Sequence, residues 1–297
     1  MAEDLIHSAA QAREAETFAA LIGAARLRQQ AAHQRSPPTP RFLLEGAHAM
    51  AAHMAMSKER VQACLGPMAL WQLYLQSAIG GNTWDFAAVR ENMPWSCERV
   101  RAALAPLEAR PQVVSTIFHM AAFPLICALI GTVWRDMHDG PLHLLVASRN
   151  MGWFRLESNR WVRDYWVRNE IEVVNTDVAG LRQLVAGLRN GSIRRLLILA
   201  DGPQSPGTPG TRALNGVSPR LGIKTTLLSK IHRMGIPLAP VTHEWDAGGL
   251  LVTPRPLLDP AILDEAETLN AVVRHIEDLL RRHPEQWMNW NAARIRT

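Results

Sequence analysis

One uncharged run constrains the fold of this chain more than any other stretch. Pro111–Trp134 is 24 residues long and contains no Asp, Glu, Lys or Arg. By length alone, such a run could span a bilayer. Its first half is β-branched, however, and it contains polar residues such as His119, while Pro124 interrupts its middle. Because proline is tolerated in the first turn of a helix and resisted deeper in, we expect a strand, a turn that carries His119, and a helix that begins near Ala122 or Phe123.

The rest of the chain after this run alternates between two kinds of segment, short β-branched strands and amphipathic helices. Strands are predicted over residues 112–118, 142–148, 171–176, 193–200 and 236–245, and helices over residues 123–134, 161–169, 178–191, 224–235 and 264–284. The segment between the fourth strand and the following helix is predicted as turn and loop. This pattern indicates an α/β fold with a mixed, largely parallel sheet flanked by helices, whose sites lie at the carboxyl ends of the strands.

The first part of the chain, residues 1–107, is predicted to be a helical region that precedes an α/β core of residues 108–297. A helix rich in Ala, Gln, Arg and Glu is expected over residues 1–33. The segment Gln34–Arg41 follows it, and the prolines near 36–40 predict an extended linker because they cannot continue a helix.

The helical pattern then runs from Phe42 to Leu107. Ser57 is a plausible N-cap for one helix, which we expect to stop at Gly80. Ser96 is a possible N-cap for the next helix.

Composition and charge narrow the class of protein. Of the 297 residues, 47% are hydrophobic and 20% are charged, which is typical of a globular protein. The net charge of +5 is spread along the chain, so it favours anionic partners such as an acidic carrier protein, phosphate groups or a membrane surface, and it argues against nucleic acid. The N-terminus is polar and acidic, which predicts no signal peptide and a cytoplasmic protein.

Cysteine and histidine usage argues against metal and disulfide chemistry. The three cysteines, Cys64, Cys97 and Cys127, are too few and too scattered for a disulfide framework or a zinc site, and we expect reduced, mostly buried thiols. The histidines outside the uncharged run show no ligand spacing such as HExxH, which predicts no metal ion.

Several segments from Pro111 to Arg296 resemble, in the same order, those of a known superfamily. These segments read TIFHMAAF, LLVASRN, GLRQLVAGLRNGSIRRLLILADG, TRALNGVSPRLGIKTTLLSKIHRMGIPLAPV and IEDLLRRHPEQWMNW. They resemble the lysophospholipid acyltransferase superfamily, and within it the branch of the lipid A biosynthesis acyltransferases. The resemblance implies a glycerolphosphate acyltransferase-like core. It also implies transfer of an acyl group from an acyl-carrier-protein or coenzyme A thioester to a hydroxyl or amine, with no other cofactor.

In that superfamily, a histidine followed by four residues and an acid forms a catalytic dyad. The resemblance therefore makes His119 the general base that activates the acceptor. The acid position is occupied by Pro124, which is a departure from the pattern. Asp201, after the fourth strand, and Glu244, at the end of the fifth, could replace the missing acid. Each also has a simpler interpretation, Asp201 as a turn former and Glu244 as a solvated strand end. Alternatively, His119 acts alone, through a water, or through groups of the substrate.

A second departure concerns the acceptor. The segment DGPQ contains Gly202 and resembles a family block in which an arginine holds the acceptor's phosphate, but Gln204 stands at that position. Since glutamine lacks the charged fork of arginine, a phosphorylated acceptor is not expected. Arg149 and Arg212 remain as candidate anion contacts, although each could equally be a surface arginine.

Two further substrate contacts are expected from the segments that resemble the acyl-binding groove and the fifth strand, Thr225 and Glu244. Membrane-bound relatives carry an N-terminal anchor, whereas this chain begins with a polar helix. We therefore expect a soluble or peripheral enzyme whose acceptor is a soluble or carrier-bound biosynthetic intermediate of specialised metabolism, with acyl-carrier protein as a partner.

Two other functions stay open at this stage. Pro124 favours an acyltransferase fold that has lost catalysis and instead binds acyl chains or a partner enzyme, and a thioester hydrolase would use His119 to activate water. The aromatic–basic stretch of residues 151–166 contains Trp153, Trp161 and Trp166. It suits stacking on nucleic acid or a membrane interface, but we favour a place in the acyl groove or the core.

Overall fold

A computed structural model of the chain describes residues 12–14, 16–17, 20, 41–80, 86–120, 123–138, 140–146, 164, 166–167, 170–246 and 249–293. Its main sheet has six strands in the order β3-β2-β4-β1-β8-β9. The strands are β1 (Val113–Ile117), β2 (Leu142–Val146), β3 (Ile171–Asn175), β4 (Arg195–Leu199), β8 (Leu238–Asp246) and β9 (Gly249–Pro254). All neighbours pair in parallel except β8 and β9, so the mixed, largely parallel sheet predicted from the sequence is confirmed.

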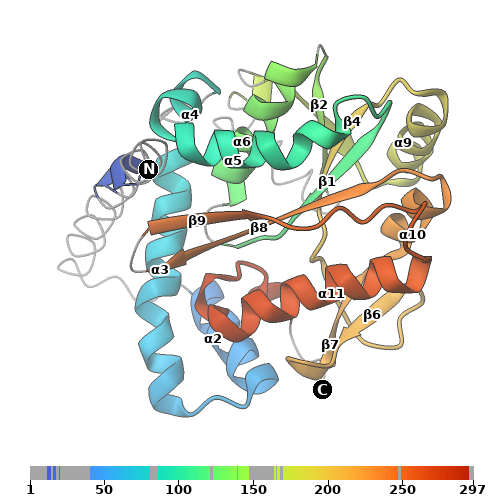
Figure 1. Ribbon diagram of the computed structural model, residues 1–297. Coiled ribbons are helices and arrows are strands. Elements are labelled where there is room, and N and C mark those ends of the chain that lie inside the picture. Colours follow the sequence, from blue (N-terminus) through green and yellow to red (C-terminus); the bar gives the residue numbers. More distant parts are fainter. Residues whose placement is uncertain are drawn as a thin grey trace.

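Helices cover both faces of this sheet. The α-helices are α2 (Arg41–Met54), α3 (Lys58–Gly80), α4 (Phe86–Asn92), α5 (Pro94–Leu104), α6 (Phe123–Met137), α9 (Val178–Asn190), α10 (Thr226–Arg233) and α11 (Glu265–Arg282), and the 3-10 turns are η1 (Ala105–Leu107), η3 (Pro284–Gln286) and η4 (Trp290–Ala292). Figure 1 shows α5 and α6 on one side of strands β8 and β9 and α11 on the other.

Alternating residues of β1 divide the core into two hydrophobic clusters. Val113 and Ile117 pack with α4, α5 and α6, whereas Val114 packs with α9, α10 and α11. Because side chains alternate between the two faces of a strand, a parallel strand covered on both faces is buried throughout. This accounts for the fully buried pattern of β1.

The described part of the uncharged run forms the strand and the helix that were expected, with His119 between them. Its strand is β1 and its helix is α6, which begins at Phe123 with Pro124 as its second residue. The fully buried faces of β1 and α6 make the run a core segment. Across the described ranges, no helix combines the length and the apolar character needed to cross a bilayer.

The caps of the N-terminal helices agree with the sequence at one position and differ at another. Ser57 Oγ accepts a hydrogen bond from the backbone N–H of Arg60, and α3 ends at Gly80, as predicted. Ser96 as a cap is wrong, since α5 begins two residues earlier with Pro94 in its first turn. The buried carboxylate of Glu14 takes the capping role, because it accepts from both the N–H and the hydroxyl of Ser96, at 2.9 and 2.6 Å.

The N-terminal helices pack directly on the rest of the protein. Residues of α4 and α5 share a hydrophobic cluster with α6, and α2 packs against η4 near the C-terminus. The three cysteines are free and buried, as expected. The proline-rich linker, most of the helix predicted over residues 1–33 and most of that predicted over residues 161–169 lie outside the described residues.

A second, smaller sheet stands where a loop was expected. It is antiparallel, in the order β5 (Pro203–Gln204), β7 (Ser218–Lys224) and β6 (Thr211–Leu214). Strand β9 was not predicted either. The segment of residues 201–224 is rich in Gly and Pro, which resembles a loop locally, and its strands become stable only through pairing with one another.

Candidate active site

Parallel pairing of β1 with β4 brings two of the predicted residues together at the carboxyl edge of the sheet. Ile117, the last residue of β1, is in register with Leu199, the last residue of β4. His119 and Asp201 each follow two residues later. His119 Nδ1 consequently lies 2.6 Å from Asp201 Oδ1, although 82 positions separate them in the sequence. The carboxylate beside His119 therefore comes from the end of β4 and not from position 124 of α6, which is a proline.

The carboxylate of Asp201 is fully buried and surrounded by N–H donors. Its side chain is 0% exposed. Oδ2 accepts from the backbone N–H of His119 and from the indole N–H of Trp287, each at 2.7 Å. Oδ1 faces the imidazole of His119. Since hydrogen bonds donated to a carboxylate favour its ionised form, this environment suits a buried anion that orients the histidine.

The contact with Asp201 determines which nitrogen of His119 can act as a base. An ionised carboxylate only accepts hydrogen bonds, so Nδ1 donates to it and Nε2 carries the free lone pair. The side chain of His119 is 25% exposed and lies in the lining of a large cleft. The ring of Phe123 packs against it with a centroid distance of 5.0 Å.

The cleft beside His119 has a volume of about 880 Å³. It lies between α9 and α10, over the ends of β2 and β4. Its apolar lining comes from Leu145, Val178, Leu181, Val185, Ala186, Ile198, Leu199, Ala200, Leu227 and Leu228. Helix α9 supplies a continuous apolar stripe because Val178, Leu181 and Val185 recur at helical spacing. Such a volume with such a lining suits an extended hydrocarbon chain.

Four cations lie among these apolar residues. Arg182 and Arg189 come from α9, Lys224 from the end of β7, and Lys230 from α10, and no Asp or Glu is among the described residues of the lining. Within the described part of the chain, none of the four side chains forms an ion pair. The neighbouring Arg233 of α10, in contrast, is paired with Glu265 at 2.6 Å. The cleft is therefore both apolar and positively charged, which suits an amphiphile with anionic groups.

Of the six predicted substrate contacts, two line the cleft, three lie elsewhere, and one is outside the described residues. Gly202 and Gln204 are in its lining. The guanidinium of Arg212 bonds instead to Asn270 of α11. The hydroxyl of Thr225 donates to the carbonyl of Gly210, outside the lining. Arg149 lies outside the described residues.

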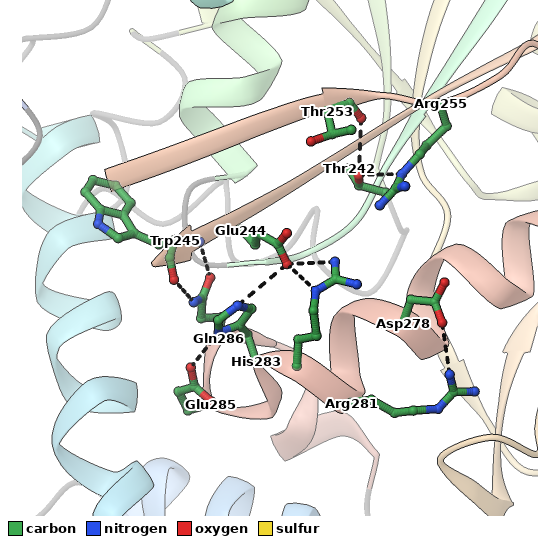
Figure 2. Close-up of polar contacts among 11 residues, drawn as sticks. Thr242, Glu244, Trp245, Thr253, Arg255, Asp278, Arg281, His283, Glu285 and Gln286 are labelled. Carbon is green, nitrogen blue, oxygen red and sulfur yellow. Dashed lines mark hydrogen bonds and ion pairs between the residues drawn. The ribbon is translucent and has the colours of Figure 1, made fainter. Parts of the chain in front are cut away.

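Glu244 is directed to a different place from Asp201. Figure 2 shows its carboxylate directed toward the side chain of His283, on the side of β8 that faces α11. Arg282 Nε donates to the same carboxylate at 2.8 Å. Arg282 Nη2 lies 2.7 Å from Glu244 Oε2. Glu244 therefore takes part in an ion-pair cluster, away from the cleft that holds His119.

Several residues of this region were not singled out from the sequence. Lys224 and Asn289 line the cleft, and Trp287 holds Asp201. His243 of β8 is fully buried, and neither of its ring nitrogens has a partner among the described residues. Burial lowers its pKa to about 4. Trp287 and Asn289 lie in IEDLLRRHPEQWMNW, one of the segments quoted for the resemblance, which assigned no role to them.

Comparisons with known proteins leave the family open. A scan against protein-family models and a search of curated proteins both found no match. Among the residues that the structure describes, no group of three or more His, Cys, Asp and Glu side chains is arranged to hold a metal ion.

Proposed function

We propose that this protein is an acyltransferase that moves an acyl group from a thioester donor to a hydroxyl or amine acceptor. The observation that carries the proposal is the buried Asp201 carboxylate, 2.6 Å from the imidazole of a histidine that lines a large apolar cleft. A base with a free Nε2, an acid that orients it and a hydrocarbon-sized cleft are what acyl transfer requires. Pro124 no longer argues for a protein that has lost catalysis, because Asp201 supplies a carboxylate from the end of β4.

In the proposed reaction, His119 Nε2 accepts the proton of the acceptor's hydroxyl or amine while the acceptor's oxygen or nitrogen attacks the thioester carbonyl carbon. Asp201 stabilises the imidazolium that forms. The carbonyl oxygen becomes an oxyanion, and the side chains of Gln204 and Lys224 in the cleft lining are N–H donors that could receive it. The tetrahedral intermediate collapses, the carbon–sulfur bond breaks, and the leaving thiolate takes the proton from His119.

The cations of the cleft support an anionic donor. Arg182, Arg189 and Lys230 can hold the phosphates of coenzyme A or the acidic surface of a carrier protein while the chain occupies the apolar lining. The acceptor then enters beside His119. We propose a soluble or carrier-bound acceptor, for which the glutamine at position 204 is the supporting observation.

The proposal is tested by product identification. The purified protein is incubated with long-chain acyl-coenzyme A and acyl-carrier protein and a panel of hydroxyl and amine acceptors, and the products are identified by mass spectrometry. An acylated acceptor, absent with His119→Ala, is the expected result. Free fatty acid alone would point to a thioester hydrolase. Binding of acyl chains with no product would point to a protein without catalysis.

A further inference from the structure

A short segment near the C-terminus holds both members of the His119–Asp201 pair. The segment is Gln286–Trp290, with the sequence QWMNW. The indole N–H of Trp287 donates to Asp201 Oδ2 at 2.7 Å. The backbone N–H of Met288 donates to the carbonyl of His119 at 2.8 Å, and the amide of Asn289 donates to the carbonyl of Asp201 at 3.3 Å. Three successive residues therefore each make one contact with the pair.

The indole of Trp287 is also held by aromatic packing. Its side chain is buried, with 1% exposed, and meets the ring of Trp290 edge-on at a centroid distance of 4.6 Å. Trp290 in turn stacks on His53 of α2, whose Nε2 lies 2.7 Å from the carbonyl of Ala293. The N-terminal helix α2 therefore supports the position of Trp287 through Trp290.

The geometry around Asp201 gives Trp287 a role that packing alone does not explain. Asp201 Oδ2 accepts from the backbone of His119 and from Trp287, so only Oδ1 remains for the imidazole. The indole N–H is the sole polar group of a tryptophan, and it is a donor only. It therefore opposes rotation of the carboxylate and stabilises its negative charge at the same time.

We propose that Trp287 is a positioning residue of the dyad. Its indole N–H holds Asp201 in the orientation that presents Oδ1 to His119 Nδ1, and it donates a hydrogen bond to the charged group that faces the imidazole. The catalytic part of this inference rests on the proposed acyl transfer, whereas the effect on the imidazole does not depend on any activity.

The chain offers a matched control for this proposal. Trp287→Phe removes the indole N–H that Asp201 accepts and keeps most of the aromatic volume. Trp290→Phe removes an equally buried indole N–H from the same segment, but that group donates to the backbone carbonyl of Pro284, at 2.6 Å. Both variants are expected to lose stability to a similar extent, so a difference between them in the dyad reports the contact with Asp201.

The first readout is kinetic. For Trp287→Phe we expect kcat to fall about 10-fold with KM for the donor unchanged, and the acidic limb of the kcat/KM profile to move about one pH unit higher, since a hydrogen bond to a charged group is lost. Trp290→Phe keeps an aromatic ring against Trp287 and leaves the indole N–H of Trp287 on Asp201, so the wild-type profile should be retained. Equal kinetic effects of the two variants would mean that Trp287 acts through packing alone.

The second readout needs no substrate. The titration of the His119 ring is followed by NMR in the wild type and in both variants. We expect the ring to titrate at higher pH in Trp287→Phe and as in the wild type in Trp290→Phe. The inference is wrong if Trp287→Phe titrates like the wild type, or if both variants shift together. Should the wild type transfer no acyl group, the proposed function fails, and the titration still decides the role of Trp287.

Discussion

Two histidine–carboxylate pairs in this protein use the same chemical groups in different surroundings. His119 and His283 are almost equally exposed, with 25% and 24% of their side chains accessible. His119 lies 2.6 Å from a carboxylate, Asp201, that is 0% exposed. His283 Nε2 lies 3.6 Å from the carboxylate of Glu244 (Figure 2). Arg282 also binds this carboxylate.

The difference lies in the other partners of each acid. The additional donors to Asp201 are neutral N–H groups, so its full charge faces His119. The charge of Glu244 is already balanced by the guanidinium of Arg282, at 2.7 Å. A histidine is poised as a base when its acid has no competing cation, and its exposure alone does not distinguish the two cases.

The largest expected effect separates the two histidines. His119→Gln should lower kcat/KM for acyl transfer about 10³-fold or more, because the general base is lost. His283→Gln should stay within about two-fold of the wild type, because His283 lies outside the cleft. Steady-state kinetics with thermal melting curves checks both variants. Similar losses in the two would remove the distinction between the pairs.

A third histidine, His243, sharpens the comparison, because it is buried and forms no hydrogen bond or ion pair with an acid among the described residues. Burial lowers the pKa of His243 to about 4, below its ordinary 6.5. The unfolded chain therefore takes up a proton at this residue as the pH falls from 6.5 to 4, and the folded protein does not. Because this protonation stabilises the unfolded state, the free energy of unfolding is higher at pH 7 and falls toward pH 4. His275, whose pKa burial also lowers to about 4, adds to the same loss.

The variant His243→Leu isolates this contribution, since His275 is present in both proteins. Between pH 7 and pH 5 the variant should lose about 2 kcal/mol less unfolding free energy than the wild type. Urea unfolding at the two pH values measures the difference. Parallel losses in the two proteins would mean that His243 does not stay neutral in the fold.

The cations that line the cleft should also behave differently from the paired cation beside it. The double variant Arg182→Gln, Arg189→Gln removes two cleft cations that have no acidic partner among the described residues, and it should lower kcat/KM for an anionic donor about 5-fold to 10-fold, with a weaker salt dependence. Arg233→Gln removes a neighbouring cation that is paired with Glu265 and should change kcat/KM little. Steady-state measurements of kcat/KM at two salt concentrations compare the two variants.

The smallest expected effect concerns the ion pair between Arg282 and Glu244, which lies outside the cleft. Arg282→Met leaves Glu244, which is 14% exposed, without its main partner and should lower the free energy of unfolding by about 1 kcal/mol. Activity should remain at the wild-type level. Urea unfolding measures the first quantity, and a loss of activity in the folded variant would show that this pair contributes to the site.

Local signals in the sequence predicted those parts of the fold that local interactions determine. Pro124 marked the first turn of α6, and Gly191 marked the end of α9, where it has φ 77°. Asp264 stands at the predicted start of α11, where its carboxylate and Glu267 form a capping box. Each of these depends on a few neighbouring residues.

The contact between His119 and Asp201 depends on strand register, which no local pattern contains. Asp201 and Glu244 both follow or end predicted strands, and the sequence offered them as alternatives. The pairing of Ile117 with Leu199 decides for Asp201. Strand parity was an unused signal, because Glu244 alternates with the buried His243 along β8 and so faces the opposite side.

The most direct test of the central claim compares Asp201 with Glu244. Thiol release from a long-chain acyl thioester is measured in the presence of the acceptor for the wild type, Asp201→Asn and Glu244→Gln. We predict that Asp201→Asn lowers kcat/KM about 10³-fold to 10⁴-fold while Glu244→Gln stays within about two-fold of the wild type. A folded Asp201→Asn variant with wild-type activity would contradict the account.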